Sequence, residues 1–132
     1  MKASELMLNN WVEYETPTTE FRYGKVIGIS EHYVTIGTLN DNVCVEIDKV
    51  GQIPITSNIL KKNEFEKYFA GYYKNPKELH ISCDENQEHW YISDSHEQYI
   101  HGDSVASFSA VHELQNILRI LGFNDLADNF KI

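Results

Sequence analysis

The feature that most constrains the fold is a series of short alternating segments that fills residues 10–55. Apolar and polar side chains alternate with a period of two, the pattern of a β-strand with one face on a core. Residues that favour tight turns separate the segments. We expect strands at residues 10–14, 21–29, 33–36, 43–48 and 50–55, with Gly24 and Gly28 at packing or bulge positions. Five such strands predict a small SH3-like β-barrel over residues 1–56.

The second half, residues 57–132, changes to mixed helix and strand. Thr56 or Ser57 is expected to cap a helix that runs through Tyr68 and ends before Gly71. A three-stranded antiparallel meander is then expected, with strands at residues 78–82, 88–93 and 98–101. The fold class is therefore α+β: the barrel is followed by a helix, a three-stranded sheet and a C-terminal helix, and the two domains are expected to pack together.

The C-terminal helix has the strongest periodic signal. Ser107 or Ser109 is expected to cap it, and Gly122 is placed to end it. Between them an apolar stripe at helical spacing is formed by Val111, Leu114, Ile117, Leu118 and Leu121. A short helical turn is expected at residues 124–129, with Phe130 folding back.

The composition excludes several classes of protein. Of 132 residues, 20 are Asp or Glu and 11 are Lys or Arg, so the formal charge is -9. A hydrophobic content of 42% argues against disorder, and two cysteines argue against a disulfide scaffold. No apolar run is long enough for a membrane helix and no signal-peptide pattern begins the chain, so we expect a cytoplasmic protein with no membrane partner. The acidic balance argues against nucleic acid as a partner.

Cys44 and Cys83 both lie in β-prone segments. We expect both to be buried and reduced, as free cysteines usually are in a reducing compartment. A disulfide between them is the alternative.

Residues 78–118 are unusual because they hold no Lys or Arg, eight carboxylates and five of the six histidines. These histidines are His80, His89, His96, His101 and His112. Strand pairing of His80, His89 and His101, or the spacing of His80 and Cys83, could provide zinc ligands. The HExxH, paired CxxC and Asp-x-Asp signatures are absent, as are the GxSxG, Walker A and GxGxxG motifs. We therefore expect a solvated acidic face and assign no metal, cofactor or catalytic residue. The alternative is a pH-sensitive surface, because histidines beside carboxylates titrate near or above pH 6.5.

Aromatic residues provide the best argument for a binding surface. Trp11, Tyr14, Phe21, Tyr23 and Tyr33 all fall within the expected barrel. Most of these rings are expected to fill its small core. The alternative is a surface groove that binds an extended peptide.

Four segments in combination carry a family resemblance: residues 5–12, 53–56, 59–66 and 111–117. The chain resembles a family of small uncharacterised proteins of Bacteroidetes genomes and their phages or prophages. That family has a GNWV-like start, a PIPLT-like junction, an LxxxGF-like helix and an HxLQN-like C-terminal helix. The resemblance implies a phage or mobile-element setting and no particular activity.

Two residues replace glycines of that family pattern. Asn9 tolerates a left-handed backbone, so a turn there is expected to survive. Glu64 tolerates it poorly, so we expect the first helix of the second half to end differently.

The HxLQN-like motif places His112, Gln115, Asn116 and Arg119 on the side of the helix opposite the apolar stripe. We expect a solvated face or contacts to neighbouring loops. The alternative is a partner-binding surface, and catalysis by His112 is not favoured.

These observations predict a non-enzymatic protein-interaction module, associated with a phage or mobile element, that binds an unknown protein partner or itself. One alternative is a nucleic-acid-associated accessory protein. Another is a metal-dependent enzyme that uses the histidine-rich acidic sheet.

Overall fold

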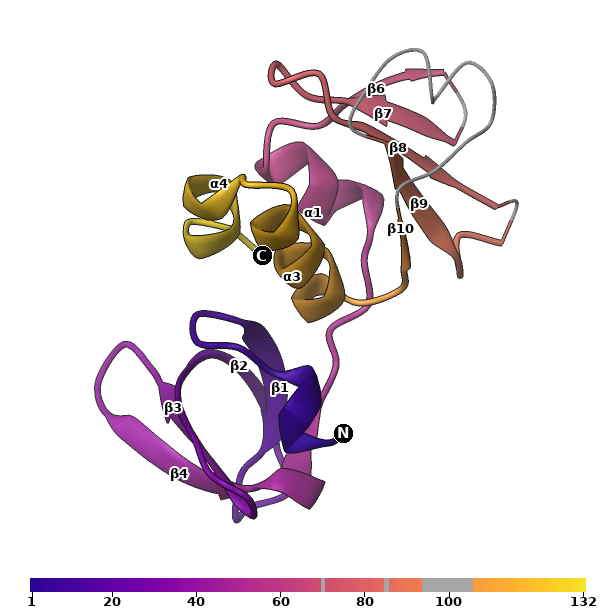
Figure 1. Ribbon diagram of the computed structural model, residues 1–132. Helices are drawn as coiled ribbons and strands as arrows, with labels where there is room; N and C mark the ends of the chain where they lie inside the picture. Colours follow the sequence, from indigo (N-terminus) through magenta and orange to yellow (C-terminus); the bar gives the residue numbers. More distant parts are fainter. Residues whose placement is uncertain (70, 85, 94–105) are drawn as a thin grey trace. The chain divides into compact units, whose positions relative to one another are not determined.

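The first half of the chain forms one five-stranded antiparallel sheet in the computed structural model, which describes residues 1–69, 71–84, 86–93 and 106–132. Its strands are β1 (Trp11–Glu15), β2 (Phe21–Ile29), β3 (Tyr33–Gly37), β4 (Asn42–Glu46) and β5 (Val50–Gly51). Their order is β4-β3-β2-β1-β5, and Figure 1 shows β1 to β4 curling around a common interior. Five strands are confirmed, but the last two are shorter than expected, because β4 ends at Glu46 and β5 covers only Val50–Gly51. No pairing among the described residues joins β4 to β5, so the closed barrel that we expected is not shown.

One face of this sheet, together with Leu6, forms a core of branched aliphatic side chains and the single ring of Tyr14. Its buried members are Leu6, Val12, Tyr14, Val26, Val34, Ile36, Val45 and Val50. Gly24 lies on the same face, where a Cβ atom would collide with the side chain of Ile36. The register of β2 against β3 shifts between Val26 and Gly28, which marks a bulge. Both glycines therefore have the packing and bulge roles that we expected.

The C-terminal helices belong to the same compact unit as this sheet. Unit 1 comprises Met1–Pro54 and Ala110–Asp128, and unit 2 comprises Ile55–Ser109 and Asn129–Ile132. In addition to the sheet, unit 1 contains the short 3₁₀ helices η1 (Ala3–Glu5) and η2 (Ile47–Lys49) and the helices α3 (Val111–Ile120) and α4 (Asn124–Asp128). The boundary at residue 56 between independent domains stays a prediction.

The start of α3 differs from our expectation. Its N-cap is Ala110, whose backbone N–H donates to Glu113 Oε1 at 3.1 Å. Capping by Ser107 or Ser109 is therefore wrong, because Ser107 lies inside a strand (β10, Ala106–Phe108) and Ser109 precedes the cap. A glutamate at the third helical position can satisfy this end of a helix without a serine at the N-cap.

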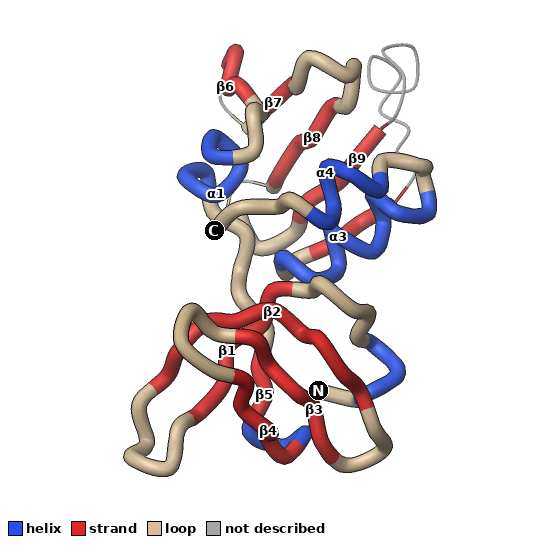
Figure 2. Tube along the Cα trace, turned by 90° about the vertical axis from the view of Figure 1, so that its left-hand side faces the viewer, coloured by secondary structure: helices blue, strands red, loops and turns tan. Residues whose placement is uncertain are grey.

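Unit 2 is a helix followed by a second five-stranded antiparallel meander. The helix is α1 (Ser57–Lys62), and the remaining strands are β6 (Glu66–Phe69), β7 (Tyr72–Lys74), β8 (His80–Cys83) and β9 (Trp90–Ser93). The order is β10-β9-β8-β7-β6, and Figure 2 shows β6 to β9 lying in sequence across the sheet. The inner face is buried and includes Tyr73, Ile81, Trp90, Ile92 and Phe108. The described residues are therefore α+β, with two antiparallel sheets.

Two expectations for this unit were wrong. The helix capped by Thr56 ends at Lys62 instead of Tyr68, because residues Glu66–Phe69 pair with β7. The expected three-stranded sheet also gains β6, β7 and β10, which we did not predict as strands. The strands expected near residues 78–82 and 88–93 are confirmed as β8 and β9. The strand expected at residues 98–101 lies outside the described residues.

The backbone conformation after Lys62 explains why α1 is shorter than expected. Glu64 adopts a left-handed backbone with φ of 68°, and the N–H groups of Glu64 and Phe65 donate to the carbonyls of Lys61 and Leu60. This is a Schellman motif, which normally places glycine where Glu64 stands. Our expectation that the helix would end differently was wrong, whereas Asn9 takes the left-handed turn that we expected, with φ of 70°.

The helix α3 ends in the same motif with the usual residue. Gly122 has a φ of 91°, and the N–H groups of Gly122 and Phe123 donate to Arg119 and Leu118. This confirms the expected C-terminal glycine, and α4 confirms the expected helical turn after it. Every helix among the described residues is too short or too polar to span a lipid bilayer.

Candidate functional site

The polar face of α3 is used to hold the N-terminal segment of unit 1. Gln115 is completely buried, and its Oε1 atom accepts the backbone N–H of Trp11 at 2.8 Å. Its Nε2 atom donates to the carbonyl oxygens of Asn9 and Ala127, both at 2.9 Å. One side chain therefore joins the segment before β1, the first residue of β1 and the helix α4.

Asn116 and Arg119 extend this hydrogen-bond network along the helix. Asn116 Oδ1 accepts from Asn10 Nδ2 at 2.9 Å, and its Nδ2 donates to the carbonyl of Glu5 at 3.2 Å. Arg119 donates to Asn116 Oδ1 and forms an ion pair with Asp128, both at 3.1 Å. The expected contacts to neighbouring loops are confirmed. The other expectation, that this face is solvated, was wrong. This surface is occupied within unit 1.

His112 is also buried, with 4% of its surface exposed. Its Nδ1 atom has no hydrogen-bond partner in the part of the chain that the structure describes. Burial lowers the pKa of His112, and the carboxylates of Glu113 and Glu5 oppose this shift. A neutral imidazole enclosed in unit 1 has little access to a substrate, so its position gives no support for catalysis.

The aromatic residues of the first sheet separate into two groups. Tyr14 is buried with 3% exposure, whereas Phe21, Tyr23 and Tyr33 are 63%, 55% and 48% exposed. The expectation that most of these rings fill the core is therefore wrong. The fifth ring, Trp11, is half-buried, and the Lys25 ammonium lies 5.4 Å from its centroid.

Each exposed ring of this group lies directly across from a glutamate on the neighbouring strand. The register pairs Phe21 with Glu15, Tyr23 with Glu13 and Tyr33 with Glu46. Paired residues of an antiparallel sheet share a face, so the outer face of the sheet combines aromatic rings with carboxylates. Ile27 of β2 is also exposed, whereas Ile29 pairs with the core residue Val34 and therefore belongs to the inner face. We call the four apolar residues Phe21, Tyr23, Ile27 and Tyr33 the outer aromatic face.

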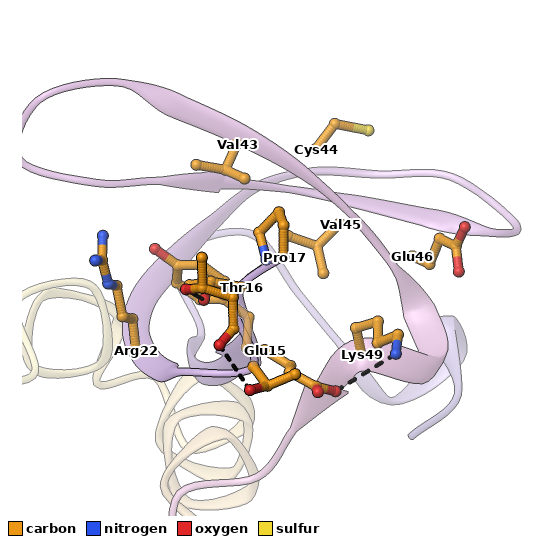
Figure 3. Close-up of a pocket in the computed structure, with 12 residues that line it drawn as sticks. Glu15, Thr16, Pro17, Arg22, Val43, Cys44, Val45, Glu46 and Lys49 are labelled. Carbon is orange, nitrogen blue, oxygen red and sulfur yellow. Dashed lines mark hydrogen bonds and ion pairs between the residues drawn. The ribbon is translucent and has the colours of Figure 1, made fainter.

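A cavity of about 600 Å³ lies between the β1–β2 turn and β4. The turn contributes Thr16, Pro17, Thr18 and Thr19, β4 contributes Val43, Cys44, Val45 and Glu46, and the remaining lining residues are Tyr14 and Glu15 of β1, Arg22 of β2 and Lys49. Figure 3 shows Pro17 and Val45 within this space, while the side chains of Cys44 and Glu46 point away from it. Lys49 Nζ and Glu15 Oε2 form an ion pair at 3.5 Å at one end.

The sequence pattern does not indicate this cavity. Its walls come from one turn and one strand that are far apart in the sequence, and they meet because β4 lies at the edge of the curved sheet. The single local signal was Pro17, which fixes the turn opposite β4. The alternation of apolar and polar residues does not predict strand order, and strand order decides which strand lies at the edge.

The histidine-rich stretch is not assembled into a metal site by the described residues. Among them, no group of three or more His, Cys, Asp or Glu side chains is placed to hold a metal ion. His80 is buried and His89 is exposed, whereas His96 and His101 lie outside the described residues. The zinc hypothesis therefore has no support from His80, His89 or Cys83.

The two cysteines are free, as expected, but they are not both buried. Cys44 is exposed on β4, and Cys83 is half-buried at the end of β8. Burial raises the pKa of the Cys83 thiol, and the neighbouring carboxylate of Asp84 raises it further. Cys44 is therefore the more accessible thiol.

Both units are acidic. Unit 1 contains 11 carboxylates and 5 Lys or Arg side chains, a formal charge of -6, and the remaining nine carboxylates and six basic side chains give unit 2 a charge of -3. Neither unit has the net positive charge typical of a nucleic-acid-binding domain. Comparison of the chain with protein-family models, with curated proteins and with solved structures finds no match.

Proposed function

We propose that the protein is a non-enzymatic protein-interaction module that binds its partner through the outer aromatic face. The observation that carries this proposal is the exposure of Phe21, Tyr23 and Tyr33, each paired with a glutamate. Aromatic side chains are enriched in the energetically important parts of protein interfaces. When a partner covers exposed rings of this size, their apolar surface is removed from water, and this favours association.

The carboxylates of Glu13 and Glu46, beside Tyr23 and Tyr33, favour a basic partner, whereas Glu15 beside Phe21 already forms an ion pair with Lys49. Lys and Arg side chains interact favourably both with carboxylates and with the faces of aromatic rings. The charge of -6 on unit 1 strengthens this preference and opposes association with another acidic protein. The proposal therefore favours a Lys- or Arg-bearing protein over a second copy of this chain.

Two finer parts of the proposal rest on the sequence. The five short strands and their curl support an SH3-like barrel for unit 1. The family resemblance of residues 5–12 and 111–117 supports a phage or mobile-element setting. Two free cysteines fit a reducing, cytoplasmic compartment.

The test is a pull-down from native lysate with and without nuclease, read by mass spectrometry. The bait is the full chain, compared with a Phe21→Ser, Tyr23→Ser double variant and with Leu39→Ser. Leu39 is fully exposed in the β3–β4 turn, so it controls for the loss of a surface apolar residue. We expect one protein to be retained by the wild type and by Leu39→Ser after nuclease treatment, and to be lost by the double variant. Retention that requires nucleic acid, or that survives the double variant, would contradict the proposal.

A further inference from the structure

The strand β4 presents backbone hydrogen-bonding groups at an open edge of the first sheet. It pairs on one side with β3 and ends the strand order on the other. In an antiparallel pair, alternate residues direct both N–H and C=O toward the partner strand, and the others direct them away. The edge residues of β4 can therefore be identified from the pairing pattern.

The hydrogen bonds at both ends of the β3–β4 pair establish this pattern. Thr38 N–H donates to the carbonyl of Asp41, and Ile47 N–H donates to the carbonyl of His32, both at 2.9 Å. Because the direction of the backbone groups alternates along the strand from these two end pairs, Val43 and Val45 direct their N–H and C=O groups toward β3. Asn42, Cys44 and Glu46 direct theirs toward the open edge. The Asn42 N–H is already bound by Asp41 Oδ1 at 2.7 Å.

The cavity beside this edge is lined by apolar side chains on the inner side. Val45 and Pro17 lie within it, and Tyr14 contributes to its wall. This open cavity has a volume of about 600 Å³, which is within the usual range for ligand-binding clefts. An extended chain beside β4 would place every second side chain against this apolar surface.

The other side chains of such a chain would face the outer surface of the sheet. There they would lie beside Glu46 and, one strand further, Tyr33. Glu46 is exposed and has no ion-pair partner in the described parts of the chain. Lys or Arg side chains at these positions would therefore find both a carboxylate and an aromatic ring.

From this geometry we propose that an extended segment of a partner protein adds to β4 as a sixth strand. The segment alternates apolar residues, which enter the cavity, with Lys or Arg residues, which face Glu46 and the neighbouring ring of Tyr33. This is strand addition, in which backbone hydrogen bonds supply affinity and alternate side chains supply specificity. The inference rests on the proposed function and specifies its partner.

A proline at position 46 tests the backbone contact with little strain. Glu46 has φ of -60° and ψ of 141°, and proline requires a φ near -65°. Its N–H points to the open edge, so Glu46→Pro removes a donor that β3 does not use. Glu46→Gln is the matched control, because it removes the charge and keeps the N–H group.

The probe is a displayed library of random twelve-residue peptides, selected on the full chain. We expect enrichment of sequences that alternate apolar residues with Lys or Arg. A synthetic enriched peptide should bind Glu46→Pro roughly tenfold or more weakly than Glu46→Gln, the effect of about one backbone hydrogen bond. Circular dichroism and thermal melting establish that both variants fold.

A second measurement on the wild type does not depend on any variant. Amide hydrogen exchange at Cys44 and Glu46 should slow when the peptide binds, because both N–H groups become paired. No enrichment, or binding without this protection, would overturn the inference. A peptide that loses affinity in the Phe21→Ser, Tyr23→Ser variant but not in Glu46→Pro would overturn strand addition and leave the proposed function standing. A wild-type dimer that Glu46→Pro converts to monomer would overturn the choice of a basic partner.

Discussion

Replacing Gln115 should show how much the fold of unit 1 depends on one buried side chain. Gln115→Met keeps the approximate volume and removes all three hydrogen bonds, which measure 2.8, 2.9 and 2.9 Å. At about 1 kcal/mol for each bond lost, unit 1 should lose about 3 kcal/mol of unfolding free energy. That is a large fraction of the stability of a small domain.

Gln115→Glu should separate the donor role from the acceptor role. The carboxylate can still accept the Trp11 N–H, but its second oxygen faces the carbonyls of Asn9 and Ala127. Burial and these carbonyls should raise the pKa of the new carboxyl above the ordinary value of about 4.3. A raised pKa in the folded state means that the destabilisation grows as pH rises. The variant should therefore be less stable than Gln115→Met at pH 7 and recover as the pH falls toward about 4.3.

The measurement is a urea titration followed through backbone amide NMR signals of unit 1, so that unit 2 does not contribute to the transition. Gln52→Met is the control, because Gln52 is an exposed glutamine in the same unit and its replacement should change stability by less than about 0.5 kcal/mol. A loss below about 1 kcal/mol in Gln115→Met, or a pH-independent loss in Gln115→Glu, would refute this account of the network.

Three further predictions concern backbone strain, titration and thiol access. Glu64 and Gly122 both have a left-handed backbone conformation, which glycine adopts with less strain than glutamate. In chemical denaturation, Glu64→Gly should therefore stabilise unit 2 and Gly122→Glu should destabilise unit 1, each by about 1 kcal/mol. Effects of the same sign in the two variants would contradict this. Burial lowers the pKa of His112, so its contribution to stability is complete above about pH 6.5 and is lost as pH falls below it; His112→Leu should flatten the pH dependence of the stability of unit 1 below about pH 6.5. Ellman's reagent should modify Cys44 faster than Cys83 at pH 8, and Cys44→Ser should abolish the fast phase.

Alternation predicted the strands of the first sheet but not which face forms the core. In β2, the residues with the larger apolar side chains, Phe21 and Tyr23, are exposed, and Gly24 and Val26 face inward. A period of two separates the faces and leaves their assignment open. The interior of a small curved sheet has room for glycine and branched aliphatic side chains and little room for rings.

The wrong prediction of where α1 ends has a similar cause. Residues 57–68 have apolar positions at helical spacing, but the chain leaves the helix at Glu64 and forms β6. Buried Asn63 donates to the carbonyls of Ile59 and Lys131 and accepts the N–H of Lys131 at 2.8 Å. Lys131 is 68 residues away, so no local propensity could indicate this contact.

By itself, the sequence determined the existence and approximate bounds of the first five strands, the apolar stripe of α3, its terminal Gly122 and the acidic character of the chain. These depend on interactions within a few residues, or on composition alone. Only the tertiary structure decided that Gln115 and Asn116 hold the N-terminal segment, that the aromatic rings of β2 and β3 are exposed, and that β4 forms an open edge beside a cavity. Those properties depend on strand order and on contacts between residues about a hundred positions apart, which alternation and helical periodicity do not encode.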